Sequence, residues 1–133
     1  MNNDIEREFV NTFVIKNMRE RLLFELLSGK KRNKSLSRFA HSSADILDPK
    51  YTFRVNAKEE VLNEIARNDD VHSGKAYVIS DIYDGIEMEA QEAIDFAFEE
   101  YGVVIVIFKG GIAFVKSELE QGLADKCLLK MSH

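Results

Sequence analysis

The densest hydrophobic pattern in the chain is a run of six apolar residues from 103 to 108. A run this short and continuous is typical of a strand that is covered on both faces. Gly110-Gly111 follows, and two adjacent glycines can adopt the positive φ angles that a two-residue hairpin loop requires. The pattern therefore predicts a hairpin of two strands, 103–108 and 112–116, in which Ile107 faces Phe114.

An amphipathic helix is predicted directly before this hairpin, over residues 86–101. Its apolar residues recur at helical spacing, and its opposite face is acidic. Asp84 and Glu87 have the spacing of a capping box, and Gly102 stands where a left-handed C-terminal cap is expected. A strand at 76–80 precedes the helix, so the order strand, helix, strand predicts parallel pairing through a right-handed crossover.

The N-terminal part of the chain has a helical pattern over residues 4–27, without Gly or Pro. Its apolar residues lie on two faces, and such a helix must be covered twice: by the core and a second helix, by a partner chain, or after a kink. The polar cluster at 16–21 is the predicted position of a break. A second, shorter helix is predicted at 36–47, after a basic segment.

The remaining elements are short. Residues 51–55 alternate between apolar and polar, which predicts a strand. Asn56 and Glu59 have capping-box spacing at the start of a predicted third helix that is lined by apolar residues at 61–66. The pattern of 125–131 fits either a last helical turn or a final strand.

These elements predict one α+β domain over residues 1–133. It comprises a helical N-terminal part (4–47), a sheet-forming core (51–117) and a short C-terminal element (118–131). The expected fold is a small mixed β-sheet whose β-α-β-hairpin core packs against the N-terminal helices. Its predicted strands lie near 51–55, 76–80, 103–108 and 112–116.

Composition predicts a cytoplasmic protein that does not enter membranes. No run of 18 apolar residues is present, and the N-terminal sequence is too polar and acidic for a secretory signal. Cys127 is the single cysteine, so no disulfide can form within the chain.

Charge divides the chain into two halves. The net charge is −5, but residues 1–58 hold 12 Lys and Arg against 7 Asp and Glu, whereas residues 59–133 hold 6 against 16. Such asymmetry indicates either two partner surfaces or two sides of one fold that pair with each other.

The leading functional hypothesis is a regulatory binding protein that acts through protein–protein contacts or self-association, for example as a homodimer. The two-sided apolar pattern at 4–27 and an acidic helical face motivate it. Small immunity-type inhibitors of toxic enzymes, to which this chain is analogous in size and charge, use acidic faces to steer association with basic partners. The predicted partner-binding residues are Glu92, Asp95, Glu99 and Glu100.

A nucleic-acid-binding protein is the first alternative. Its candidate residues are Lys30, Lys31, Arg32, Lys34 and Arg38, whose cations could contact phosphates. The same cations would also stabilise the end of the preceding helix through its dipole, and the sequence pI of about 5.2 argues against general nucleic-acid affinity.

A small metal-dependent hydrolase is the second alternative. Asp81 and Asp84 follow the strand at 76–80, and paired carboxylates can hold a divalent cation or transfer protons. The motif D-x-x-D-G is similar to the D-x-D-G-T nucleophile loop of haloacid-dehalogenase phosphatases, but its spacing is one residue longer and the Thr is absent. His41 or His72 would have to supply a third polar group. No sequence motif predicts a cofactor or a resident metal.

Overall fold

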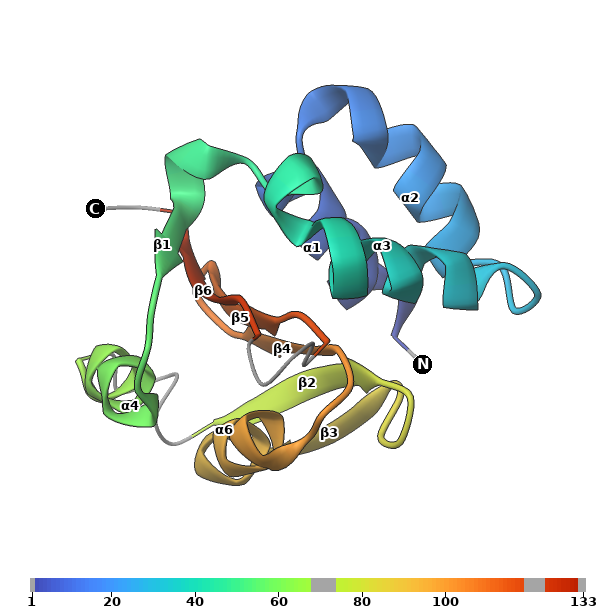
Figure 1. Cartoon of the computed structure of the whole chain (residues 1–133). Coiled ribbons are helices and arrows are strands. Elements are labelled where there is room, and N and C mark those ends of the chain that lie inside the picture. Colours follow the sequence, from blue (N-terminus) through green and yellow to red (C-terminus); the bar gives the residue numbers. More distant parts are fainter. Residues whose placement is uncertain (1, 68–73, 119–123, 132–133) are drawn as a thin grey trace.

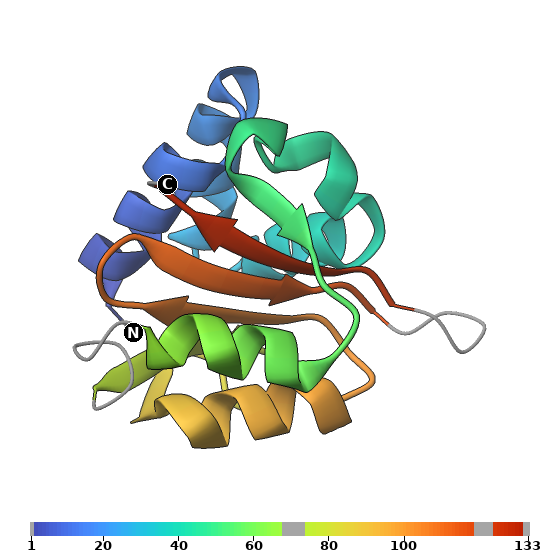
Figure 2. The same cartoon turned by 90° about the vertical axis from the view of Figure 1, so that its left-hand side faces the viewer.

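The computed structural model describes residues 2–67, 74–118 and 124–131. It contains a six-stranded antiparallel sheet between two helical layers (Figures 1 and 2). The α+β fold predicted from the sequence is confirmed. From one edge of the sheet to the other, the strands are β1 (Thr52–Arg54), β6 (Lys126–Lys130), β5 (Ile112–Lys116), β4 (Val104–Phe108), β2 (Lys75–Ser80) and β3 (Ile86–Glu89).

The N-terminal helices cover one face of the sheet, as predicted. They are α1 (Asn3–Phe13), α2 (Arg19–Leu26) and α3 (Arg32–Ile46), and they lie above the sheet in Figure 1. Phe9 and Phe39 from this layer belong to the same buried cluster as Ile79 and Ile105 from the sheet. Apolar burial of this kind is the main force that holds such layers together.

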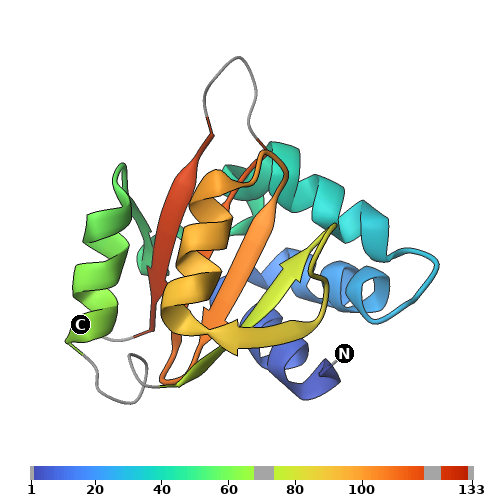
Figure 3. The same cartoon turned by 90° about the horizontal axis from the view of Figure 1, so that it is seen from below.

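Two further helices, α4 (Lys58–Ala66) and α6 (Ala90–Glu99), cover the opposite face (Figure 3). Ile65 and Ile94 pack there in one cluster with Val106 and Phe114. Because helices bury both faces, β4 is apolar along its whole length and β5 is apolar from Ile112 to Val115, rather than alternating. None of the helices in the described part of the chain has the length and apolar content that crossing a membrane would need.

The predicted break in the N-terminal helix is confirmed. α1 ends at Phe13, a short 3₁₀ turn occupies Lys16–Met18, and α2 begins at Arg19. Between the helices, the Ile15 N–H donates to the Ile46 carbonyl at 2.9 Å, which ties the bend to the end of α3. The break lets both apolar faces of segment 4–27 pack within this chain, so the pattern does not require a partner chain to cover it.

The predicted parallel pairing of 76–80 with 103–108 is wrong, because β2 and β4 are antiparallel. The cause is residues 86–89, which form a strand rather than the first turn of the predicted helix. Their apolar and acidic residues alternate with a period of two, and β3 pairs back on β2 as a hairpin. α6 then returns the chain so that β4 runs opposite to β2, and the sheet is antiparallel rather than mixed.

The predicted caps of the 86–101 helix are wrong for the same reason. α6 begins at Ala90 after Glu89 and ends at Glu99, and the residue that follows, Glu100, is extended. Asp84 therefore lies six residues before the helix, and its carboxylate binds Arg32 instead. Gly102 is not among the glycines with positive φ in the described residues.

The central hairpin is confirmed, but its register is shifted by one residue. Phe108 pairs with Ile112 and Val106 with Phe114, so the loop has three residues, Lys109 to Gly111, instead of two. A shift of one residue exchanges the two faces of a strand. Since both faces are buried and apolar here, the hydrophobic pattern could not distinguish the two registers.

Other predicted boundaries need smaller corrections. α3 begins at Arg32 rather than near 36, so most of the basic segment is helical. At α4, Glu60 rather than Glu59 closes the N-terminus: its Oε1 accepts the N–H groups of Asn56 and Ala57, each at 2.9 Å. The ambiguous segment 125–131 forms a strand, β6.

Candidate functional site

Four large apolar side chains lie on the surface where the β2–β3 loop (residues 81–85) meets the end of α6. They form what we call the corner patch: Ile82, Tyr83, Ile86 and Tyr101, which are 61%, 42%, 43% and 72% exposed. The Tyr83 ring packs edge-on against Phe96 of α6, with ring centroids 4.9 Å apart. The Asp81 carboxylate lies beside Gly102, next to Tyr101.

The loop that carries the patch is fixed by polar contacts. The Ser80 hydroxyl accepts the Tyr83 N–H at 2.9 Å, and the Gly85 N–H donates to the Val78 carbonyl at 2.8 Å. Gly85 has a φ of 73°, a conformation that glycine adopts without a steric penalty. These contacts hold the loop in one shape, so its exposed side chains are presented in a defined arrangement.

The segment that carries Tyr101 is held by a buried lysine. The Lys116 ammonium donates to the Gly102 carbonyl at 2.6 Å and to the Ser117 carbonyl at 3.1 Å. Lys116 is 2% exposed, and this burial lowers the pKa of its ammonium group. The turn between α6 and β4 is therefore attached to the end of β5.

Arg32 anchors the other side of the loop through a buried network. Its guanidinium binds the Glu6 carboxylate through two bonds of 2.7 Å and the Asp84 carboxylate through bonds of 2.6 and 2.8 Å. The fifth N–H donates to the Leu26 carbonyl at 2.9 Å. The Tyr77 hydroxyl donates to Glu6 at 2.6 Å and accepts the N–H of Asn2 at 2.9 Å.

Every donor of the Arg32 guanidinium is used, so this network has the character of a structural clamp. Burial lowers the pKa of Arg32, but the hydrogen bonds that its guanidinium donates to Glu6 and Asp84 outweigh this effect and raise that pKa overall. Burial and the hydrogen bond to Glu6 raise the pKa of Tyr77 to about 12. Both groups therefore keep their protons under ordinary conditions, and the clamp ties the β2–β3 loop to α1 and α3.

The part of the chain that carries the corner patch is rich in acidic residues, which we call its acidic surround. From 81 to 100 the sequence holds eight Asp and Glu residues and no Lys or Arg. The exposed members include Asp81, Glu87, Glu89, Glu92 and Glu99. The site therefore combines an apolar centre with a negatively charged surround.

The four predicted partner-binding residues lie at or near this site, but they differ in their contacts. Glu92 and Glu99 are exposed on α6. Asp95 binds Lys58 of α4 at 3.0 Å, and this hydrogen bond lowers the pKa of Asp95. The Glu100 carboxylate accepts the backbone N–H of Tyr101 at 2.8 Å. Glu92 and Glu99 are thus the members with the most accessible charge.

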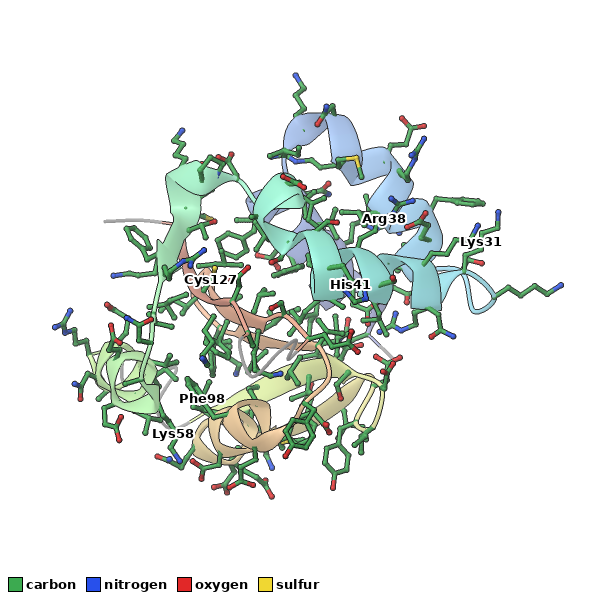
Figure 4. All side chains as sticks on the ribbon, in the orientation of Figure 1. Lys31, Arg38, His41, Lys58, Phe98 and Cys127 are labelled. Atoms are coloured by element: carbon green, nitrogen blue, oxygen red, sulfur yellow. The ribbon has the colours of Figure 1, made fainter. Side chains whose placement is uncertain are left out.

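The basic segment lies in the other helical layer. Figure 4 shows Lys31 and Arg38 on the opposite side of the sheet from Lys58. Arg32 is buried in the clamp, and Arg38 binds Glu25 at 2.8 Å, an interaction that lowers the pKa of Glu25. The other three cations of the predicted set, Lys30, Lys31 and Lys34, are exposed, and the Lys31 ammonium lies 5.0 Å from the centre of the exposed Phe24 ring.

The predicted hydrolase residues are not brought together. Asp84 is bound to Arg32, whereas His41 lies nine residues further along α3, roughly 13 Å at 1.5 Å per residue. The His41 imidazole lies 3.3 Å from the Glu118 carboxylate, beside a cavity of about 270 Å³ that Ser42 and Ser43 help to line. His72 is outside the described residues. Those residues contain no group of three His, Cys, Asp or Glu side chains that could hold a metal ion.

A second concave region of about 610 Å³ lies between α1 and the β4–β5 loop. Its apolar lining includes Phe9, Ile107 and Met131, and its volume is in the range of small-molecule sites. Its charged lining residues are two lysines and two glutamates: Lys75, Lys109, Glu8 and Glu87. This balanced set does not select one class of ligand.

Comparison with protein-family models, with curated proteins and with solved structures finds no match for this chain. The assignment of a function therefore depends on the geometry of the chain itself.

Sequence reasoning missed the corner patch and the clamp, for different reasons. The long acidic stretch from 81 to 100 is visible in the sequence, and apolar residues within such a stretch are a signal that could have marked the patch. The clamp joins Glu6, Arg32, Tyr77 and Asp84, and its directly bonded pairs lie up to 71 residues apart along the chain. No pattern of neighbouring residues predicts contacts between residues that lie so far apart along the chain.

Proposed function

We propose that this protein is a regulatory protein-binding module that captures a basic partner through the corner patch and its acidic surround. The observation that carries the proposal is a set of exposed apolar side chains on and beside a loop that polar contacts hold in place. Exposed apolar residues that gather on one surface are characteristic of interaction sites.

The composition of the site matches the anatomy of protein interfaces. Interfaces have an apolar centre enriched in aromatic residues and a polar rim. Tyr83 and Tyr101 are suited to be central anchors, because tyrosine is common among the residues that contribute most to binding. Glu92 and Glu99 supply charges at the rim. Such charges chiefly speed association and favour a partner of opposite charge. A preordered loop also reduces the entropy lost on binding.

An inhibitor of the immunity type, acting in the cytoplasm on a basic enzyme, is the form of this function that the size and charge of the chain support best. Nucleic-acid binding has less support, because Arg32 and Arg38 of its five candidate cations are bound to carboxylates. A hydrolase has less support, because Asp84 is committed to the clamp.

The test is a comparison of captured partners between two matched double variants. Glu92→Lys with Glu99→Lys reverses two charges beside the corner patch. Glu20→Lys with Asp45→Lys reverses two exposed charges in the other helical layer, and Glu20, like Glu92, lies in the first turn of its helix. Each variant and the wild type are immobilised and exposed to the same cell extract, and the retained proteins are quantified by mass spectrometry.

We expect the wild type and the Glu20/Asp45 variant to retain the same basic proteins, and the Glu92/Glu99 variant to retain them at least about tenfold less. Retention should also fall when salt is raised, since rim charges are screened. Circular dichroism establishes that both variants are folded. Equal retention by the two variants would contradict the proposal.

A further inference from the structure

β3 forms one edge of the sheet, and in the described part of the chain β2 is its one neighbouring strand. Three of its four residues are exposed: Ile86, Glu87 and Glu89. An edge strand presents unpaired N–H and C=O groups to its open side, where an extended segment of another chain can pair with it.

The direction of these backbone groups follows from one hydrogen bond. The Val78 carbonyl accepts the Gly85 N–H, so it points from β2 toward β3. Alternate residues of a strand direct their backbone groups to the same side, so the backbone groups of Ala76 also point toward β3, where Met88 is its register partner. The N–H and C=O groups of Glu87 and Glu89 then point away from β2, to the open side of the edge.

The side chains of β3 have different chemistry on the two faces of the sheet. Glu87 and Glu89 lie on the α1 side, because Glu87 is paired with Tyr77, whose side chain packs in the α1–α3 layer. Ile86 and Met88 lie on the α6 side, where Met88 packs against the buried cluster. A strand added at this edge would meet carboxylates on one face and apolar side chains on the other.

We propose that the open edge of β3 pairs with an extended segment of the partner in which Lys or Arg residues alternate with apolar residues. This inference rests on the proposed function and names the part of the partner that is bound. The cations of the segment lie beside Glu87 and Glu89, and its apolar residues lie beside Ile86, continuous with the corner patch. Main-chain hydrogen bonds supply affinity, and the alternation of side chains supplies selectivity.

Charge also selects against pairing between two copies of this edge. Two β3 strands side by side would bring four carboxylates together, and like charges on neighbouring strands destabilise a pair. The acidic residues thus protect the edge from self-association, while the same residues favour a basic strand.

The test uses a fluorescent eight-residue peptide of alternating Lys and Val as the probe, with binding followed by anisotropy. Glu87→Pro removes an N–H that points to the open side, a position where an edge strand tolerates proline. Glu87→Gln is the matched control, because it removes the same charge and keeps the N–H. We expect Glu87→Gln to weaken binding about two- to threefold and Glu87→Pro to weaken it at least about tenfold.

Two further measurements keep the test decisive if Glu87→Pro fails to fold. A peptide with methylated nitrogens on its pairing edge should lose binding to the wild type, and binding of the unmodified peptide should slow hydrogen exchange at the Glu87 and Glu89 amides. Equal weakening by the Pro and Gln variants, or unchanged exchange, overturns the inference. A solution mass that grows with concentration in the wild type and not in Glu87→Pro also overturns it, because the edge would then bind a second copy.

The outcomes separate this inference from the proposed function. If Glu92→Lys with Glu99→Lys abolishes capture of basic proteins while Glu87→Pro retains it, the protein is a binding module but the β3 edge is not its contact, and this inference fails alone. Loss of capture in both variants supports the two proposals together.

Discussion

The Glu6 carboxylate has no exposed surface, and it accepts hydrogen bonds from both Arg32 and Tyr77. A buried charge is stable when it is paired and its remaining acceptor sites are satisfied. Among the described residues, no fully buried side-chain nitrogen or oxygen is without a hydrogen-bond partner. At the scale of single residues, the buried ionised groups Glu6 and Arg32 are therefore stabilised as members of one hydrogen-bonded network.

Because Tyr77 belongs to this network, the stability of the folded protein depends on pH in the alkaline range. Burial and the hydrogen bond to Glu6 raise the pKa of the phenol to about 12, against 10.0 for its ordinary value. Between these two pH values the folded protein retains the proton and the unfolded chain loses it, so stability falls as the pH rises through this window. We expect one tyrosine to ionise at higher pH than the ordinary value. This late component should appear in the tyrosinate absorbance when it is recorded within seconds of a jump to high pH.

The Tyr77→Phe variant should lack that late component and show a shallower loss of stability between pH 10 and 12. Tyr101→Phe is the control, because Tyr101 is exposed and its removal should leave the component in place. A wild-type titration without a component above about pH 11 would contradict the assignment.

At the scale of elements, the sequence prediction was wrong for two short segments, residues 86–89 and the β4–β5 loop. Ile86 fits the helical periodicity of the following residues, and it also begins an alternating strand. Helix and strand templates compete for such short segments, and pairing with β2 decided the outcome. The length of the β4–β5 loop likewise follows from strand pairing. β5 pairs with β4 on one side and with β6 on the other, and these contacts select its register.

The β4–β5 loop predicts a clear difference between two glycines. Gly111 has a φ of 73°, and a Cβ added there would lie 3.0 Å from the Cβ of Met131. A non-glycine residue in this conformation costs about 1–2 kcal/mol, so Gly111→Ala should destabilise the protein by at least that amount in chemical denaturation. Gly29→Ala is the control, because no atom lies within 4 Å of its added Cβ. A Gly111→Ala variant as stable as Gly29→Ala would be inconsistent with this loop geometry.

At the scale of the whole molecule, one arginine joins two of the three layers. Arg32 on α3 binds Glu6 on α1 and Asp84 at the corner of the sheet. The opposite layer carries the acidic surface through α6, while the exposed lysines of the basic segment lie on α3 or between α2 and α3. The exposed charges of the two halves thus lie mainly on two helical layers that the sheet separates, while the pairs Arg32–Asp84 and Lys58–Asp95 join the basic half to the acidic half.

Removing Arg32 should therefore destabilise the fold strongly. Arg32→Met leaves the Glu6 carboxylate buried without its cation, and breaking a buried pair in this way typically costs about 3–5 kcal/mol of unfolding free energy. Arg21→Met is the control, because Arg21 is exposed and its substitution should change stability by less than about 0.5 kcal/mol. Chemical denaturation at neutral pH measures both, and a loss below about 1 kcal/mol for Arg32→Met would show that the clamp is not structural.

Local patterns were sufficient for most elements of the fold. The apolar run at 103–108, the paired glycines and the polar break near 16–21 each encode a local conformation, and the structure contains all three. The acidic residues of α6 were also identified as a surface, although Asp95 and Glu100 proved to be engaged in contacts.

The sequence by itself determined the α+β class, the positions of most helices and strands within a few residues, with β3 and β6 as exceptions, and the separation of charge, because these depend on neighbours along the chain. Tertiary structure alone decided the antiparallel strand order, the register of the central hairpin, the burial of Arg32 and the exposure of the corner patch. Each of these depends on which distant segments meet. Both faces of the sheet are buried, so periodicity does not distinguish them, and the partners in the clamp lie up to 71 residues apart.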